Sequence, residues 1–178
     1  VGTKYGLEEK IKRDGFDYIS GASRGECSIT KLESGMIDYD EVLRFILDLI
    51  ERNQWNVRAI CYDPWSFGYL LPEFEKRDLP MIEVRQGQRT LSIPTTRFRD
   101  DLFNGKLKHP DNQLLAYAVN NAILKYDANN NPIIDKAHNA TKIDPVAALM
   151  NAYTIAMDQS KESEVADNDF YSSDDFSF

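Results

Sequence analysis

The sequence of 178 residues has no long apolar run, and none of its hydrophobic stretches approaches the roughly 20 residues that a transmembrane helix needs. Its first residues are polar and lack the hydrophobic segment of a secretory signal peptide. These absences predict a protein of the cell interior with no membrane-spanning part. The hydrophobic fraction of 42% and the length are ordinary for one globular domain with a buried core.

Cysteine is scarce, with only two residues in the chain. Cys27 and Cys61 lie in apolar, strand-like runs and have neither CxxC spacing nor histidine companions. Structural zinc sites require such ligand clusters, so we expect no zinc. Buried, reduced thiols are the expected state, which is typical of an intracellular protein.

Several motifs of common enzyme classes are also missing. The sequence has no glycine-rich phosphate loop of the form GxxxxGK[ST] and no GxSxG motif. The two histidines, His109 and His138, stand in no clear arrangement with a serine or cysteine nucleophile. By itself, the chain therefore shows no sign of an ATP site or of a serine or cysteine hydrolase.

Positive charge is in the minority, with 21 basic against 29 acidic side chains and a net charge of −8. The negative charge is unevenly distributed, because the last 20 residues hold six acids and one lysine. By contrast, the stretch 85–108 has a local charge of +4, from the basic residues Arg85, Arg89, Arg97, Arg99, Lys106 and Lys108. Such a stretch predicts contact with a phosphate backbone, although a merely solvated face would have the same composition.

The first half of the sequence predicts a strand–helix–strand unit behind a capped helix. Apolar spacing predicts a helix over 37–53, in which Asp38 and Glu41 form an acidic capping pair. The near-continuous apolar run in 55–63 predicts a strand buried on both faces, as in a parallel sheet. The other expected elements are a short helix or irregular segment at 5–14, a polar loop to Gly25, a strand at 26–32, a helix at 68–77 that Pro72 kinks or delays, and a strand at 80–85 that completes a right-handed crossover.

The second half predicts helices around a hairpin. The expected elements are a helix at 94–105 that ends at Asn104-Gly105, an edge strand at 106–109, a helix that begins at Pro110, a hairpin turning at 127–132, and a helix opened by Asp144 and Pro145. Together these elements predict an α/β domain over residues 1–158, with a mixed sheet flanked by helices. Residues 159–178 have too little apolar surface to fold alone, and we expect an acidic flexible tail.

The dipeptide Asp-Pro occurs twice, at Asp63 and at Asp144, each time between an apolar run and a predicted helix. Aspartate is a favoured N-cap and proline is favoured at the first helical position, so capping explains either copy alone. Two carboxylates at the ends of neighbouring elements also suit a hard divalent cation such as Mg²⁺. We therefore expect the carboxylates of Asp63 and Asp144 to lie close together at one sheet edge, as caps, metal ligands or both.

Four separated stretches resemble the large terminase subunits of tailed phages. They read SGMIDYDEVLRFI, VRAICYDPW, LSIPTTRFRDDLFNGKLKHPDNQLLAYAVNNAIL and KIDPVAALMNAY, and their order and spacing agree with that family over roughly residues 5–158. Such subunits join a packaging ATPase to a C-terminal nuclease, and this chain resembles the nuclease part. The resemblance implies an RNase H-like fold and a metal-dependent endonuclease that cuts concatemeric DNA during packaging.

The resemblance also implies roles for individual residues. Asp63 and Asp144 would be two of three catalytic acids around two Mg²⁺ or Mn²⁺ ions, with Asp63 bridging both ions and Asp144 holding one. Lys136 and Lys142, which lie close in sequence to Asp144, are candidates for stabilising the phosphate in the transition state, although either could simply be solvated, and the basic stretch would hold the DNA backbone. The implied partners are double-stranded DNA, the ATPase domain, the small terminase subunit and the portal, in the cytoplasm of a bacterial host.

The sequence departs from the family pattern at the first acid, which the family carries on an opening strand. The segment VGTKYG contains no acid, so we expect a chain that lacks this strand and is weakly active or inactive. Asp38, Asp40, Glu83 and Asp135 are conceivable substitutes, but none is favoured, because Asp38 fits a cap and Asp135 fits an exposed loop. Two rival functions remain: another RNase H-like enzyme such as a resolvase or integrase, and a non-catalytic module that grips DNA or docks on the portal.

Overall fold

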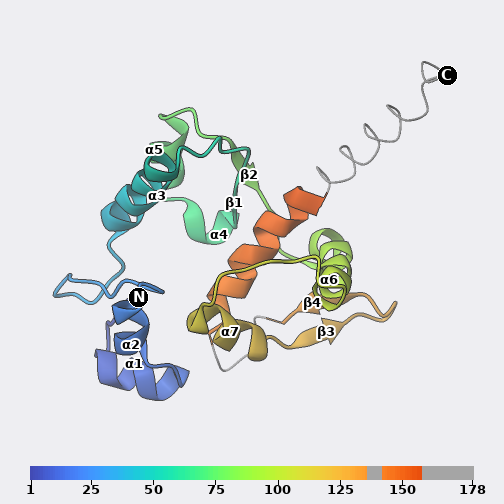
Figure 1. The fold of residues 1–178 in the computed structure, drawn as a ribbon, viewed down its shortest axis with the longest axis horizontal. Coiled ribbons are helices and arrows are strands. Elements are labelled where there is room, and N and C mark those ends of the chain that lie inside the picture. Colours follow the sequence, from blue (N-terminus) through green and yellow to red (C-terminus); the bar gives the residue numbers. More distant parts are fainter. Residues whose placement is uncertain (136–141, 158–178) are drawn as a thin grey trace, which may run out of the picture.

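The computed structural model describes residues 1–135 and 142–157 (Figure 1). The expected acidic tail and Lys136 lie outside these residues. The elements in chain order are α1 (Leu7–Asp14), α2 (Tyr18–Ser23), α3 (Tyr39–Asn53), β1 (Ile60–Tyr62), α4 (Pro64–Phe67), α5 (Leu71–Glu75), β2 (Met81–Glu83), α6 (Gln88–Phe103), α7 (Gln113–Asn120), β3 (Leu124–Tyr126), β4 (Pro132–Ile134) and a helix over residues 144–157.

Helix α3 begins where the sequence predicts. The Asp38 carboxylate accepts a hydrogen bond of 3.0 Å from the backbone N–H of Glu41, and this bond satisfies a donor that the helix leaves unpaired. The Glu41 carboxylate accepts a hydrogen bond from Ser28. The apolar side of α3 then packs into a first core cluster, whose buried members are Leu43, Leu70 and Phe74.

Strands β1 and β2 pair in parallel, with Ile60 opposite Met81 and Tyr62 opposite Glu83. The predicted parallel unit is therefore confirmed, although β1 has three residues where 55–63 was expected. Alternate residues face opposite sides of a strand. Ile60 packs against the first core cluster beside α3 and α5, whereas Cys61 lines a pocket with the helix of residues 144–157. All three residues of β1 are half-buried, so the burial on both faces that its apolar run predicts is met only in part.

The expected helix at 68–77 begins late, as α5, because Pro72 occupies one of its first two positions. Proline is tolerated there, since its missing N–H would have no partner inside the helix. Residues 68–70 form a turn between α4 and α5, and the buried Phe74 of α5 stacks on Phe67 of α4 with ring centroids 5.6 Å apart.

In the second half, the predicted hairpin is confirmed. Strands β3 and β4 are antiparallel, with Leu124 opposite Ile134, and α6 packs on β4 (Figure 1). Helix α6 starts earlier than predicted, at Gln88, and includes Pro94. It ends at Phe103, as the Asn104-Gly105 pair predicts. The helix that begins at residue 144 supplies Val146 to a second core cluster with Ala118 and Ile143.

Several expectations about individual elements were wrong, among them the start of α7, which lies at Gln113 and not at Pro110. The strand predicted at 26–32 is absent, since no described strand pairs with this segment; its backbone bonds to Val1, whose amino group donates to Ser28 and whose carbonyl accepts from the N–H of Thr30. Residues 106–109 form no strand either, since no described strand lies beside them. The loop expected before Gly25 contains α2, whose N-cap is Asp17.

The described strands form two separate pairs, one parallel and one antiparallel, and no single mixed sheet. Helices outnumber strands, and the α/β class is confirmed in the coarser sense of mixed helix and strand. Within residues 1–135 and 142–157, no helix has the length and apolar character that crossing a membrane requires.

Candidate metal and DNA-contact site

Asp63 follows β1 directly and lies at the carboxyl end of the parallel pair. Its side chain is half-buried and accepts a hydrogen bond of 3.1 Å from the backbone N–H of Trp65, so it caps α4. Pro64 fills the first turn of that short helix. The capping role predicted for Asp63 is thus confirmed, and a rigid strand end holds the carboxylate.

An open pocket of about 470 Å³ lies at the same end of the strand pair. Its walls are Pro64 and Trp65, which follow β1, Glu83, the last residue of β2, and Arg85 and Gln86, which follow β2. In open α/β sheets, ligands bind outside the carboxyl ends of parallel strands. The pocket beside Asp63 is therefore in the position where this fold would place a substrate.

The helix of residues 144–157 runs antiparallel to β1. Its last turns face the segment before β1, because Ile155 and Ala156 line a pocket with Asn56 and Val57. Further toward its start, the Oδ1 of Asn151 accepts a hydrogen bond of 3.1 Å from Gln86. The helix therefore begins toward the carboxyl end of β1, where Asp63 lies. Asp144 is the first residue of this helix and is exposed.

A polar network that includes the buried Asp14 holds the residues before the helix of residues 144–157 in place. The hydroxyl of Tyr117 on α7 donates to the backbone carbonyl of Asp14, and the backbone of Lys142 bonds to Tyr117. The Asp14 carboxylate, 1% exposed, accepts from Lys10, Arg13 and Tyr18 at 2.8 to 2.9 Å. The start of the helix is thus tied to α1, α2 and α7.

The network has clear electrostatic consequences. Burial raises the pKa of the Asp14 carboxyl, but hydrogen bonds from Arg13, Lys10 and Tyr18 outweigh burial and lower the pKa to about 2. Burial, the hydrogen bond to Asp14 and nearby negative charge raise the pKa of Tyr18, and Asp144 is one of these charges. Asp144 is therefore within electrostatic reach of Tyr18, in the region where α1, α2 and α7 meet.

The basic residues of 85–108 are mostly paired with acids. Arg85 lies 3.1 Å from Glu83, Arg99 lies 3.1 Å from Asp100, and Asp101 is shared by Arg97 at 3.9 Å and Lys106 at 3.5 Å. Arg89 and Lys108 are exposed and form no ion pair with a described residue. Of the two lysines predicted to stabilise the phosphate, the structure describes Lys142. It is exposed and lies two residues before Asp144.

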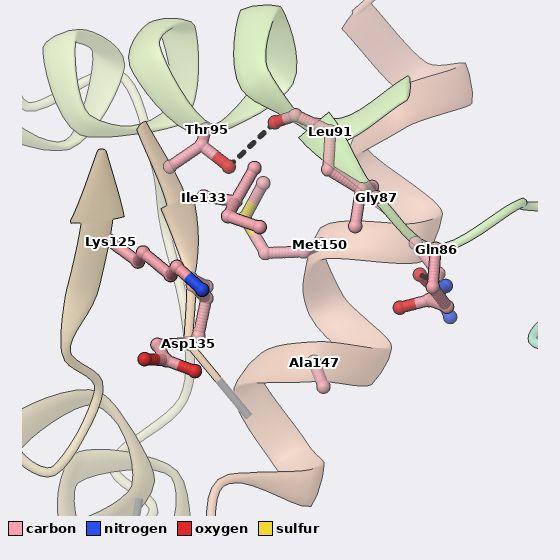
Figure 2. A pocket seen from close by; sticks show the side chains of 11 residues that line it. Gln86, Gly87, Leu91, Thr95, Lys125, Ile133, Asp135, Ala147 and Met150 are labelled. Carbon is pink, nitrogen blue, oxygen red and sulfur yellow. Dashed lines mark hydrogen bonds between the residues drawn. The ribbon is translucent and has the colours of Figure 1, made fainter. Parts of the chain in front are cut away.

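The expectation that Asp135 lies in an exposed loop was wrong. Asp135 is 9% exposed and directly follows β4, with its N–H bonded to the carbonyl of Ile123. It lines a pocket of about 300 Å³ between α6, the hairpin and the helix of residues 144–157 (Figure 2). Figure 2 shows its carboxylate and the Lys125 side chain on the hairpin side, across from Gln86.

Among the described residues, no group of three or more histidine, cysteine, aspartate and glutamate side chains is arranged to hold a metal ion. Asp63 and Asp144 do offer carboxylate oxygens, which hard divalent cations prefer. The donor chemistry of each of these two acids would therefore suit Mg²⁺ or Mn²⁺.

The sequence reasoning missed the Asp14 network and the exposure of Trp65 beside the pocket. The spacing of Lys10 and Asp14 by four residues was a usable signal, because such residues meet on a helix surface. Nothing in the sequence marks the contact of Tyr117 with Asp14, which is 103 residues distant.

The comparisons with known proteins agree with one another. The family model described as terminase large subunit, endonuclease domain, matches residues 3–160. The terminase large subunit of Enterobacteria phage HK97 is 25% identical over 145 residues, which are 80% of this chain and 28% of that protein. The crystal structure of the HK97 bacteriophage large terminase has the same fold, with a TM-score of 0.73 and 22% identity over 84% of this chain and 31% of that chain. The matched part of the chain thus spans less than a third of the length of each of these two relatives.

Proposed function

Because the chain belongs to the terminase large subunit endonuclease domain family, we propose that, as part of an intact large subunit, it hydrolyses phosphodiester bonds of double-stranded DNA during phage DNA packaging. The observation that supports a site at Asp63 is its position: it is held at the carboxyl end of a parallel strand pair, beside an open pocket that contains an arginine. The likeness of fold to the HK97 large terminase is consistent with an RNase H-like architecture.

In this proposal, Asp63 and Asp144 hold Mg²⁺ or Mn²⁺ in a two-metal site. When bound, such ions would activate a water molecule and neutralise charge on the phosphate and the leaving oxygen. Capping α4 fixes the Asp63 carboxylate before any ion arrives, which limits the ordering cost of binding. The network around Asp14 and Tyr117 does the same for the backbone that leads to Asp144.

Arg85, Arg89, Arg97, Arg99, Lys106 and Lys108 would hold the DNA backbone, and Lys136 and Lys142 would assist at the phosphate. Phosphate contacts of this kind position DNA without reading its bases. Within a longer large subunit, the domain would act together with a packaging ATPase, the small subunit and the portal. These partners follow from family membership and are part of the proposal.

The metal site can be tested without relying on cleavage. Asparagine caps helices as well as aspartate does, so Asp63→Asn removes a charge and keeps the cap of α4. Asp144→Asn removes a charge from the exposed first residue of the helix of residues 144–157. We expect Mn²⁺ to broaden the backbone amide signals near residues 63 and 144 in NMR spectra of the unchanged chain. Each variant should weaken this binding at least roughly tenfold, since a charged oxygen ligand is lost.

The matched control is Asp38→Asn, because Asp38 caps α3 with the same kind of bond, 3.0 Å long, away from the pocket. It should leave Mn²⁺ binding unchanged. If Asp144→Asn also leaves binding unchanged, the two acids do not share an ion. A plasmid-nicking assay with Mn²⁺ then separates a nuclease from a module that only grips DNA, and cleavage insensitive to Asp63→Asn would place the active site elsewhere.

A further inference from the structure

Trp65 is the most exposed large apolar side chain among the described residues, at 92%. It lies in α4 two residues before Phe67, which packs against the first core cluster. Side chains two apart on a helix are about 200° apart around its axis, so burial of Phe67 turns Trp65 away from the core. The fold therefore presents an indole ring to solvent on a helix that is anchored from behind.

The surroundings of Trp65 are those of a nucleic-acid contact. It shares the wall of the 470 Å³ pocket with Arg85, whose side chain is 84% exposed and lies 3.1 Å from Glu83, another residue of that wall. The backbone N–H of Trp65 donates to the Asp63 carboxylate, so Trp65 itself helps to position the candidate metal ligand. A large aromatic face, an arginine and a pocket open to solvent are the groups that bind an unpaired nucleobase and its phosphate.

We propose that Trp65 is a stacking platform for a nucleobase next to the bond that is cut, and that the site therefore prefers DNA whose strands are locally separated. The inference rests on the proposed function for the identity of the ligand, and it adds a positioning residue outside the acids and the basic stretch. In an intact duplex both faces of a base are covered by its neighbours, so the base must leave the stack to meet Trp65.

Stacking can be measured without metal. In the variant Trp55→Phe, excitation at the red edge reports on Trp65 alone, because the chain has two tryptophans. In EDTA, a single-stranded oligothymidylate should quench this emission and bind with a measurable Kd. An oligonucleotide with the same phosphates but abasic sugars, and an intact duplex of equal length, should quench much less.

Two substitutions make the test specific. Trp65→Ala should weaken binding of the single strand roughly tenfold, the order expected for the loss of one base–aromatic stack. Trp65→Phe should keep binding within about threefold, because a ring remains for stacking. Since the side chain is almost fully exposed, neither change should affect folding, and Trp55→Phe is the control for loss of a tryptophan.

Equal quenching by the abasic strand or the duplex would overturn the inference, as would unchanged binding in Trp65→Ala. Absence of quenching by every oligonucleotide would point instead to a protein partner on this face. Neither result depends on Mn²⁺ binding by Asp63 and Asp144. A failure of the stacking platform is therefore distinguishable from a failure of the proposed nuclease.

Discussion

Asp14 is the most deeply buried charged residue among those described, and its carboxylate has three donors. Because these donors favour the ionised form, its folded-state pKa of about 2 lies below the ordinary value of 3.8. A carboxylate with a lowered pKa stabilises the fold above its unfolded-state pKa. This contribution is lost as the pH falls from 3.8 through about 2.

We predict that Asp14→Asn lowers the free energy of unfolding at pH 7 by about 2 kcal/mol, because the charge-assisted bonds to Lys10 and Arg13 are lost. We expect the stability of the unchanged chain to decline below pH 4, and the variant should lose part of that decline, which urea unfolding at several pH values would measure. Asp17→Asn at the exposed cap of α2 is the control and should change stability by about 0.5 kcal/mol or less. Equal losses in both variants would contradict a special role for Asp14.

At the scale of single residues, the sequence predicted what depends on neighbours along the chain. The caps Asp38 and Asp63 were predictable because an N-cap bonds to a backbone N–H two or three residues ahead. The burial of Asp135 was not, since it depends on α6 and a helix that are distant in sequence. Whether Asp63 and Asp144 share a metal ion is a question of the same long-range kind, and it stays a prediction.

At the scale of elements, helix α6 and the helix of residues 144–157 are joined by one aromatic and polar contact. Phe98 and Tyr153 pack edge to face with centroids 5.2 Å apart, and the Tyr153 hydroxyl donates to Asp101 at 2.5 Å. Burial, together with this hydrogen bond, raises the pKa of Tyr153 to about 12. A tyrosine with a raised pKa contributes stability that is complete below pH 10 and is lost as the pH rises toward 12.

We predict that Tyr153→Phe lowers the free energy of unfolding by about 1 kcal/mol at pH 7, because it removes the hydrogen bond and keeps the ring contact. The loss should shrink between pH 10 and about 12, where Tyr153 of the unchanged chain ionises. Tyr126→Phe, on the exposed strand β3, is the control and should have little effect at either pH. Thermal unfolding across this pH range tests both statements.

Elements were predicted correctly where the interactions that form them are local in sequence. Helix α3 and the hairpin were predicted because caps, apolar spacing and turn residues act locally. The strand expected at 26–32 has the right composition, but a strand forms only where another strand offers its backbone. Composition cannot say that none of the described strands lies beside this segment.

At the scale of the whole molecule, the basic stretch is less positive than its composition suggests. Arg85, Arg97, Arg99 and Lys106 each lie within 4 Å of a carboxylate, so part of their charge is already offset. Arg89 differs, because it stands in the first turn of α6 without an acidic partner among the described residues. A cation there opposes the helix dipole, so Arg89 does not serve helix stability.

We predict that Arg89→Glu weakens DNA binding for all sequences alike and reduces the slope of log Kd against log salt by about one. Arg99→Glu, on the same helix but paired with Asp100, should reduce the slope less. Titrations of fluorescent duplex DNA at several salt concentrations would measure both. Unchanged slopes in both variants would mean that this helix presents only a solvated face to the DNA.

The two core clusters described above have a thermodynamic consequence. Leu43, Leu70 and Phe74 form one cluster, and Ala118, Ile143 and Val146 form another. Separately packed regions can open separately, as independent cooperative units with different local stabilities. Asp63 follows a strand that packs on the first cluster, and Asp144 follows Ile143 of the second. An ion held by both acids would bind only while both clusters are folded. The two clusters would then unfold together in the presence of the ion. Without the ion, either cluster could unfold locally by itself.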